Sequence, residues 1–240
     1  MTDRVGRRAM ILAAGLGLRM RPLTDATPKP LIELAGKPLI AYALDRLRAA
    51  GIEEVVVNVH WLPEQIEAWA QAQGPPPIVV SDERDLLLDT GGGIVRALPL
   101  LGKDPFFVLN SDSLWIEGAK PALSRMREAW RDADMDGLLL LSATAQTVGY
   151  AGQGDFQMDG NGRLARRPKG EVAPFVFAGC HLAHPRLFAA APDGPFSMNL
   201  LWDRALAAGR LCGIRHDGTW LHVGTPEAIG PAERALTMAE

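Results

Sequence analysis

Near the start of the chain, a short apolar run leads into a loop that carries two glycines, two arginines and a lysine. Gly15 and Gly17 lack a Cβ atom, so the backbone N–H groups beside them can approach a polyphosphate closely. Arg19, Arg21 and Lys29 add full positive charges, and prolines on both sides of Lys29 restrict its backbone. This combination predicts a binding site for the phosphates of a nucleoside triphosphate.

Two better-known phosphate loops do not fit this stretch. The dinucleotide fingerprint needs a third glycine, where this chain has Met20, and an acidic residue at the end of the second strand, where it has His60. A Walker loop needs Gly-Lys followed by Ser or Thr, and that sequence does not occur. For Gly-x-Gly alone, an ordinary strand-to-helix turn with solvated arginines would be a sufficient explanation. It does not explain why two arginines and Pro-Lys-Pro follow in the same stretch.

Asp112 is the second candidate for chemistry. It follows a predicted buried strand at residues 106–109, so its carboxylate is expected at the carboxyl edge of the sheet, beside the loop. Mg²⁺ typically takes one or two protein carboxylates and completes its shell with water and phosphate oxygens. The sequence therefore favours Asp112 as a metal ligand, with a simple turn-forming aspartate as the alternative.

These motifs resemble those of the sugar-1-phosphate nucleotidylyltransferases. The stretch L-A-A-G-L-G-L-R-M-R-P-L-T, followed by P-K-P-L, is similar to the long signature of that family, and the resemblance extends to about Ile229. Within the family, this chain is most similar, in its small size among other details, to the N-acetylmuramate-1-phosphate uridylyltransferases of peptidoglycan recycling. The resemblance implies UMP transfer from UTP to N-acetylmuramate-1-phosphate, with release of pyrophosphate and Mg²⁺ (or Mn²⁺) as cofactor.

The resemblance also implies roles for individual residues. Arg19 would hold the β- and γ-phosphates, Lys29 the α-phosphate, Arg167 the attacking sugar phosphate, and Asp112 the metal. His222 departs from the family, because it stands where W-x-D-x-G-T-P has a second metal-binding aspartate. Imidazole suits Zn²⁺, Co²⁺ or Mn²⁺ better than Mg²⁺, so we expect a weak or water-mediated ligand. A histidine that packs at a strand end without touching a metal is the alternative.

The base of the nucleotide is expected between residues 81 and 93. Uracil presents an N–H between two carbonyl oxygens, so it needs an acceptor flanked by donors; Glu83 is the expected acceptor, and the N–H of Gly91 an expected donor. A flexible helix start is the alternative reading of the glycines that follow Thr90. The predicted nucleotide-binding residues are Leu12, Ala13, Ala14, Gly15, Gly17, Glu83, Thr90 and Gly91.

The sugar side shows another departure, since the family's E-K-P is replaced by Arg166-Arg167-Pro168. Arg167 can still bind a phosphate in bidentate fashion. Arg166 cannot accept hydrogen bonds from hydroxyls; it would suit a sugar that carries a carboxylate, such as the lactyl group of N-acetylmuramate, or else it points to solvent. The resemblance places the sugar against Asn110, Trp115, Gly149, Arg166, Ala178 and Gly179.

Alternating strands and helices must position these residues. The pattern predicts an α/β fold with a Rossmann-like, doubly wound, mostly parallel sheet of the nucleotide-diphospho-sugar transferase type. A single domain is expected over residues 1–240, with a glycine-rich β-hairpin insertion at 149–173 that forms the sugar-side wall. Pro38 is expected at the first position of a helix over 40–47, and Thr90 at the N-cap of another. Strands are predicted at 55–59, 78–81, 106–109, 138–141 and 174–184, and further helices at 62–73, 91–98, 123–130, 197–208 and 226–239.

Bulk composition narrows the class of protein. The 240 residues are 48% hydrophobic and 22% charged, which is ordinary for a globular protein. The net charge of −3 favours neither nucleic acid nor an anionic membrane as a partner. The first apolar run is too short to span a bilayer, and Cys180 and Cys212 read as buried thiols, so we expect a cytoplasmic monomer or homodimer.

Two other functions remain compatible with the sequence. One is the same chemistry on another sugar-1-phosphate or on phosphocholine, with a different nucleotide. The other is a catalytically weak module that senses nucleotides, which the changes at Arg166 and His222 would favour. The sequence does not decide between them.

Overall fold

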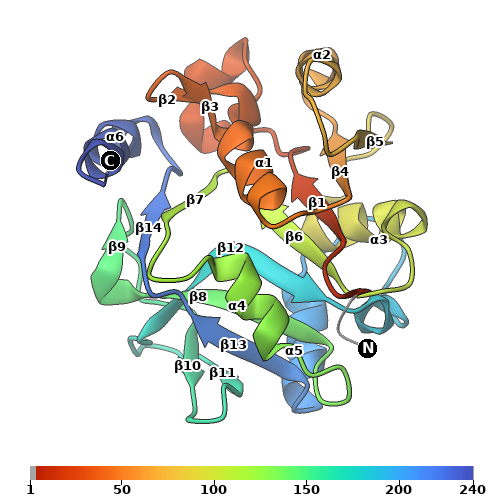
Figure 1. The fold of residues 1–240 in the computed structure, drawn as a ribbon, viewed down its shortest axis with the longest axis vertical. Coiled ribbons are helices and arrows are strands. Elements are labelled where there is room, and N and C mark those ends of the chain that lie inside the picture. Colours follow the sequence, from red (N-terminus) through yellow and green to blue (C-terminus); the bar gives the residue numbers. More distant parts are fainter. Residues whose placement is uncertain (1–3, 240) are drawn as a thin grey trace.

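The structure is a computed structural model that describes residues 4–239. Its main sheet has a parallel half made of β1 (Arg8–Leu12), β4 (Glu54–Val59), β5 (Ile78–Asp82) and β6 (Phe106–Asn110). These strands lie in the order β6-β1-β4-β5 (Figure 1), so their carboxyl ends meet at one edge. The apolar, β-branched composition of β4 fits a strand that is covered on both faces.

The other half of the sheet is mixed. β12 (Phe175–Ala183) runs antiparallel to both β6 and β8 (Gly137–Ala143), and β13 (Leu211–Arg215) adds to β8 in parallel. A hairpin of β10 (Phe156–Met158) and β11 (Leu164–Arg166) joins the sheet through β12. Within residues 4–239 this sheet has nine strands.

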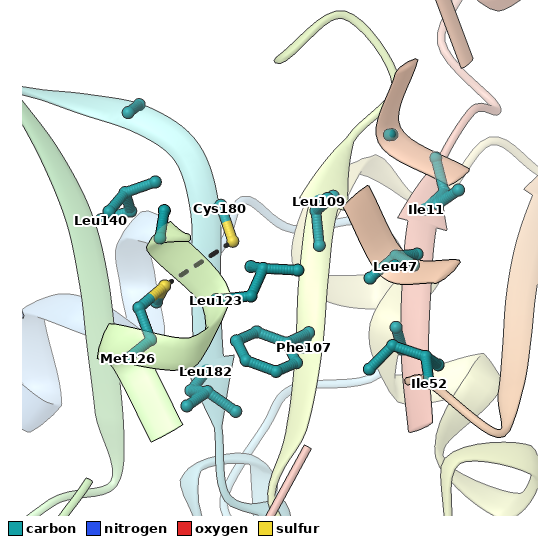
Figure 2. Close-up of a cluster of buried hydrophobic side chains, with 14 of the residues drawn as sticks. Ile11, Leu47, Ile52, Phe107, Leu109, Leu123, Met126, Leu140, Cys180 and Leu182 are labelled. Atoms are coloured by element: carbon teal, nitrogen blue, oxygen red, sulfur yellow. Dashed lines mark hydrogen bonds between the residues drawn. The ribbon is translucent and has the colours of Figure 1, made fainter. Parts of the chain in front are cut away.

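Helices cover both faces of the sheet (Figure 1). α1 (Leu39–Ala49), α2 (Pro63–Gln71) and α4 (Ala122–Ala129) bury their apolar sides on one face, while α3 (Asp89–Leu101) and α5 (Asn199–Ala207) pack on the other. Figure 2 shows the first of these cores, where Phe107 of β6 lies between side chains of α1 and α4. Fully burying one such side chain contributes about 1.5–3 kcal/mol, so this core fixes the strand ends that carry the site.

Smaller elements complete the fold. β7 (Ser113–Ile116), β14 (Thr219–His222) and β9 (Thr147–Val148) form a second sheet, and α6 (Ile229–Thr237) packs beside it. β2 (Glu33–Leu34) pairs with β3 (Lys37–Pro38). Short 3₁₀ helices are formed by Leu18–Met20, Leu23–Asp25, Lys29–Leu31, Thr144–Gln146, Pro185–Phe188 and Pro226–Ala228.

The predicted elements are present with small shifts of their ends, and two predicted helix starts are wrong. Pro38 lies at the N-cap of α1, one residue before the first helical position. Thr90 lies inside the first turn of α3, which begins at Asp89; its Oγ1 accepts a hydrogen bond from the N–H of Met198. The propensity of threonine for the N-cap is outweighed here by this tertiary contact.

Within residues 149–173, β10 and β11 pair as a hairpin with its turn at 159–162, while the role of this insertion as the sugar-side wall stays a prediction. The single domain over 1–240 stays a prediction, and residues 1–3 and 240 lie outside the described part. Among the described helices, none combines the length and apolar character needed to cross a membrane.

Candidate functional site

A cavity of about 680 Å³ lies at the carboxyl ends of β1 and β6, where open α/β sheets bind ligands. It brings together eleven of the predicted residues: Leu12, Ala13, Ala14, Gly15, Gly17, Arg19, Lys29, Glu83, Thr90, Asn110 and Asp112. The predicted phosphate loop, residues 13–19, forms one wall, and the start of α3 forms another. Segments distant in the sequence therefore converge as the motifs predicted.

The phosphate loop offers unpaired backbone donors. Across residues 14–17, no backbone N–H group donates to another group of the described chain. Gly17 has φ +64°, and a Cβ atom there would lie 2.7 Å from Thr24 Cγ2. The Thr24 hydroxyl also donates to the Gly17 carbonyl at 2.9 Å, which holds the loop in this shape. Such a concave run of N–H groups is suited to an anion.

Lys29 and Asp112 form an ion pair at the floor of the cavity, through Nζ and Oδ2. The Lys29 side chain is 12% exposed and that of Asp112 is 23% exposed, so both charges are partly shielded from solvent. Pro28 and Pro30 place Lys29 at the start of a short 3₁₀ helix. The predicted cation and the predicted metal ligand are therefore direct neighbours.

His222 lies next to this pair at the end of β14. It is opposite Ser113 in the small sheet, one residue from Asp112, and its ring lies over Gly224. Burial lowers the pKa of His222, while the charge of Asp112 raises it, and the net direction is down. The ring is therefore neutral at neutral pH and offers a lone pair. In residues 4–239 no group of three or more His, Cys, Asp or Glu side chains forms a complete metal site.

The expected direct role of Glu83 in reading the base is not supported. Its side chain borders the cavity but is 0% exposed. Oε1 accepts from Asn58 Nδ2 at 2.7 Å and Oε2 from the N–H of Leu88 at 3.2 Å. Burial raises the pKa of Glu83. Both carboxylate oxygens already accept hydrogen bonds from the protein, so Glu83 stabilises the wall of the cavity.

Gly91 does not donate to the cavity either. Its N–H donates to the Phe196 carbonyl at 2.8 Å, and a Cβ atom at this position would overlap the Phe196 ring. Asp89, two residues earlier, has φ +59° and an exposed side chain that lines the cavity. Gly91 therefore serves packing against Phe196, whereas Asp89 lines the cavity.

On the sugar side, one prediction is wrong. Trp115 is 1% exposed and lies in the core beside α1 and α4, so its side chain does not reach a ligand. Its position after Asp112 suggested the site, but the alternation of β7 turns it inward. Gly179 has φ +75° and packs against Ser113 and Asn110. Ala178 is fully buried; at Gly149, a Cβ atom would lie 2.6 Å from the His222 carbonyl oxygen.

Arg166 and Arg167 lie on the hairpin, outside the residues that line the cavity. Arg166 donates from Nε to Asp203 at 2.7 Å and from Nη2 to Asn199 Oδ1 at 2.9 Å, both on α5. Arg167 donates to the carbonyls of Gly154 and Glu171, at 2.9 Å each. Their predicted contacts with the sugar and its phosphate stay predictions that require these arginines to change partners.

Asn58 was missed by the sequence reading. It is 3% exposed, lines the cavity and accepts a hydrogen bond from the Ala13 N–H at 2.7 Å. Its signal is visible in the sequence as the single amide within the apolar run of β4. Leu87 and Asp89 lie in the predicted base-binding segment, and the other cavity residues that were not predicted are Leu16, Leu18, Met20, Pro30, Ser111 and Gly224.

Comparisons with known proteins agree with this site. Residues 9–189 match the MobA-like NTP transferase domain. The N-acetylmuramate alpha-1-phosphate uridylyltransferase of Caulobacter vibrioides is 48% identical over 96% of this chain and 97% of its own. The enzyme of the same name from Neisseria meningitidis serogroup B is 38% identical over 91% and 93%.

Among solved structures, the inositol-1-phosphate CTP transferase from T. maritima superposes with a TM-score of 0.80 at 15% identity. The match covers 98% of this chain and 96% of that one, so it supports the fold. The sequence matches and the phosphate loop together show that this chain belongs to the MobA-like NTP transferases and, among them, to the N-acetylmuramate alpha-1-phosphate uridylyltransferase family.

Proposed function

We propose that the protein transfers UMP from UTP to N-acetylmuramate-1-phosphate, giving the nucleotide sugar and pyrophosphate. The observation that carries this proposal is the cavity itself, in which unpaired N–H groups at residues 14–17, Arg19 and Lys29 surround one space beside Asp112. The substrates are those in the names of the relatives that are 48% and 38% identical. A role in peptidoglycan recycling, in the cytoplasm, follows from the same substrates.

The chemistry needs positioning and charge neutralisation. An oxygen of the sugar-1-phosphate attacks the α-phosphorus of UTP, the bond from that phosphorus to the bridging oxygen breaks, and pyrophosphate leaves. The attacking oxygen is already an anion, so no general base is required. Arg19 and the N–H groups of the loop bind the leaving β- and γ-phosphates, and Lys29 neutralises the α-phosphate as charge develops.

Asp112 is the residue that would hold a divalent cation such as Mg²⁺ or Mn²⁺. One partly exposed carboxylate fits the habit of Mg²⁺, which binds few protein oxygens and keeps phosphate oxygens and water. His222, whose pKa the charge of Asp112 affects, would add a nitrogen ligand or contact a metal-bound water. When bound, the cation would neutralise phosphate charge.

The sugar would lie beside Asn110 and Gly179, on the side of the cavity nearest the hairpin. Arg166 of the hairpin is a cation that a lactyl carboxylate could pair with in exchange for Asp203. An exposed pair such as Arg166 with Asp203 contributes only about 0–1 kcal/mol, so this exchange is inexpensive. The carboxylate would then distinguish N-acetylmuramate from plain hexoses.

A pyrophosphate-release assay tests the proposal. The purified protein is incubated with Mg²⁺, each nucleoside triphosphate in turn, and one of three sugar-1-phosphates: those of N-acetylmuramate, N-acetylglucosamine and glucose. We expect the highest kcat/KM with UTP and N-acetylmuramate-1-phosphate. Higher kcat/KM with another pair would reassign the substrates, and binding of UTP without release of pyrophosphate by any pair would contradict an enzymatic role.

A further inference from the structure

A buried chain of hydrogen bonds joins the phosphate loop to the start of α3. The Ala13 N–H donates to Asn58 Oδ1 at 2.7 Å, and Asn58 Nδ2 donates to Glu83 Oε1 at 2.7 Å. The Leu88 N–H donates to Glu83 Oε2 at 3.2 Å. Ala13 opens the wall that faces the phosphates, and Leu88 precedes Asp89 on the opposite wall. Two side chains therefore connect two sides of one cavity.

The two groups at the ends of this series of hydrogen bonds determine what the side chains between them must donate and accept. Backbone N–H groups can only donate, so Ala13 and Leu88 both require acceptors. The amide of Asn58 must turn its oxygen toward Ala13 and its nitrogen toward Glu83. Glu83 must then accept on both oxygens, which an ionised carboxylate can do and a side-chain amide cannot. Between two donors, this arrangement requires one amide and one carboxylate, because two amides or two carboxylates would leave one contact unmatched.

The surroundings leave the pair little freedom to move. A Cβ atom at Gly93 would lie 2.7 Å from Glu83 Oε1 and 3.0 Å from Asn58 Nδ2, so α3 closes over both groups. His60 Nδ1 lies 2.7 Å from the Glu83 carbonyl and holds its backbone. Glu83 is 0% exposed and Asn58 is 3% exposed. A buried carboxylate is costly, and an apolar pair would fill this space without that cost.

We propose that Asn58 and Glu83 are positioning residues that set the separation and orientation of the phosphate loop relative to the base-binding wall. What the site requires of them is one amide and one carboxylate whose donors and acceptors match, in addition to their shape. The inference rests on the proposed binding of a nucleoside triphosphate across these two walls. Neither side chain touches the reacting phosphorus; they act through Ala13 and Leu88.

Two near-isosteric substitutions, alone and together, test whether the site needs one amide and one carboxylate at these two positions. Asn58→Asp alone places two carboxylates in contact with no proton between them. Glu83→Gln alone makes the new side-chain NH₂ group face another donor, which is either the Leu88 N–H or Asn58 Nδ2. In the double variant, the new aspartate accepts from Ala13 and from the new glutamine, whose oxygen accepts from Leu88. The double variant thus restores all three hydrogen bonds, reverses only the one between the two side chains, and keeps a single negative charge.

The readouts are KM for UTP, kcat, and the Kd of UTP measured by calorimetry well below the unfolding temperature. A buried donor or acceptor left unpaired weakens the state that needs it by about tenfold or more, so each single variant should raise Kd and KM for UTP by about that factor. The double variant should return both to within about threefold of wild type. Gln71→Glu and Glu128→Gln, on exposed faces of α2 and α4, control for the changes of charge and should leave both constants unchanged.

Two results would overturn the inference. One is a double variant whose losses equal the sum of the two single variants. The other is single variants that bind UTP as wild type does. Wild-type turnover reports on the proposed function separately: if the wild type prefers another nucleotide, the four proteins are compared with that nucleotide, and recovery in the double variant still decides the matter.

Discussion

At the scale of single residues, the ion pair of Lys29 with Asp112 is central. The two charges lie together on the floor of the cavity, within reach of Arg19 and of the unpaired N–H groups of the loop. On the proposed function, Lys29 would exchange Asp112 for a phosphate oxygen when a triphosphate binds. The pair partly neutralises both charges.

Replacing Lys29 with Met should lower kcat by about 10²-fold or more, because a preorganised cation at the reacting phosphate is lost. Steady-state pyrophosphate release measures this effect. Lys103→Met, which removes an exposed lysine far from the cavity wall, should keep wild-type turnover. A Lys29 variant with near-normal kcat would mean that this lysine does not contact the reacting phosphorus.

His222→Asp should retain or improve activity with Mg²⁺, because a carboxylate suits this hard cation better than imidazole does. The measurement is kcat with Mg²⁺ and with Mn²⁺ for both proteins, and the ratio between the two metals should move toward Mg²⁺ in the variant. Complete loss of activity with both metals would show that the imidazole itself is required.

At the scale of elements, the start of α3 is shaped by its contact with residues 194–198. Phe196 accepts hydrogen bonds from the N–H groups of Gly91 and Gly92 and donates its own to the Leu88 carbonyl. A Cβ atom at Gly92 would lie 2.5 Å from the Gly194 carbonyl oxygen. These contacts connect the base-binding wall to α5, which also holds Arg166 of the hairpin.

Gly91→Ala should therefore lower the free energy of unfolding by about 1–3 kcal/mol, because the new methyl group overlaps the Phe196 ring. Urea unfolding measures this loss. Gly74→Ala is the matched control, since nothing lies within 4 Å of its Cβ position, and it should change stability by less than about 0.5 kcal/mol. Equal stabilities for the two variants would contradict the packing account.

The sequence predicted which segments meet at the edge of the sheet better than it predicted the directions of individual side chains. The phosphate loop, Lys29 and Asp112 could be found because their spacing after apolar strands places them at one sheet edge. Trp115 and Gly91 were assigned wrongly because alternation in β7 and the approach of Phe196 depend on contacts between segments distant in sequence. Such contacts leave no local pattern. Asn58 alone carried a usable signal, as an amide within an apolar strand.

At the scale of the whole molecule, His181 links stability to pH. It is 2% exposed, packs against Phe177 and Trp202, and neither ring nitrogen has a partner among the described residues. Burial lowers its pKa from 6.5 to about 3. The unfolded chain therefore takes up a proton as pH falls through 6.5, and the folded protein does not until about 3.

The free energy of unfolding should consequently fall as pH drops from 6.5 toward 3, by up to about 1.4 kcal/mol per pH unit from this residue. Above 6.5 the contribution is fully present. Urea unfolding across this window measures the slope for wild type and for His181→Phe, which lacks the titrating group. The variant should show the shallower dependence; identical slopes would mean that the buried imidazole is protonated in the folded state.

The most direct measurement for the whole account is a crystal structure with a non-hydrolysable UTP analogue and Mg²⁺. The account predicts that the triphosphate lies against the N–H groups of residues 14–17, with Arg19 and Lys29 on its oxygens and the metal at Asp112. A triphosphate bound away from this loop, or a Lys29 side chain still paired with Asp112 in the complex, would contradict it.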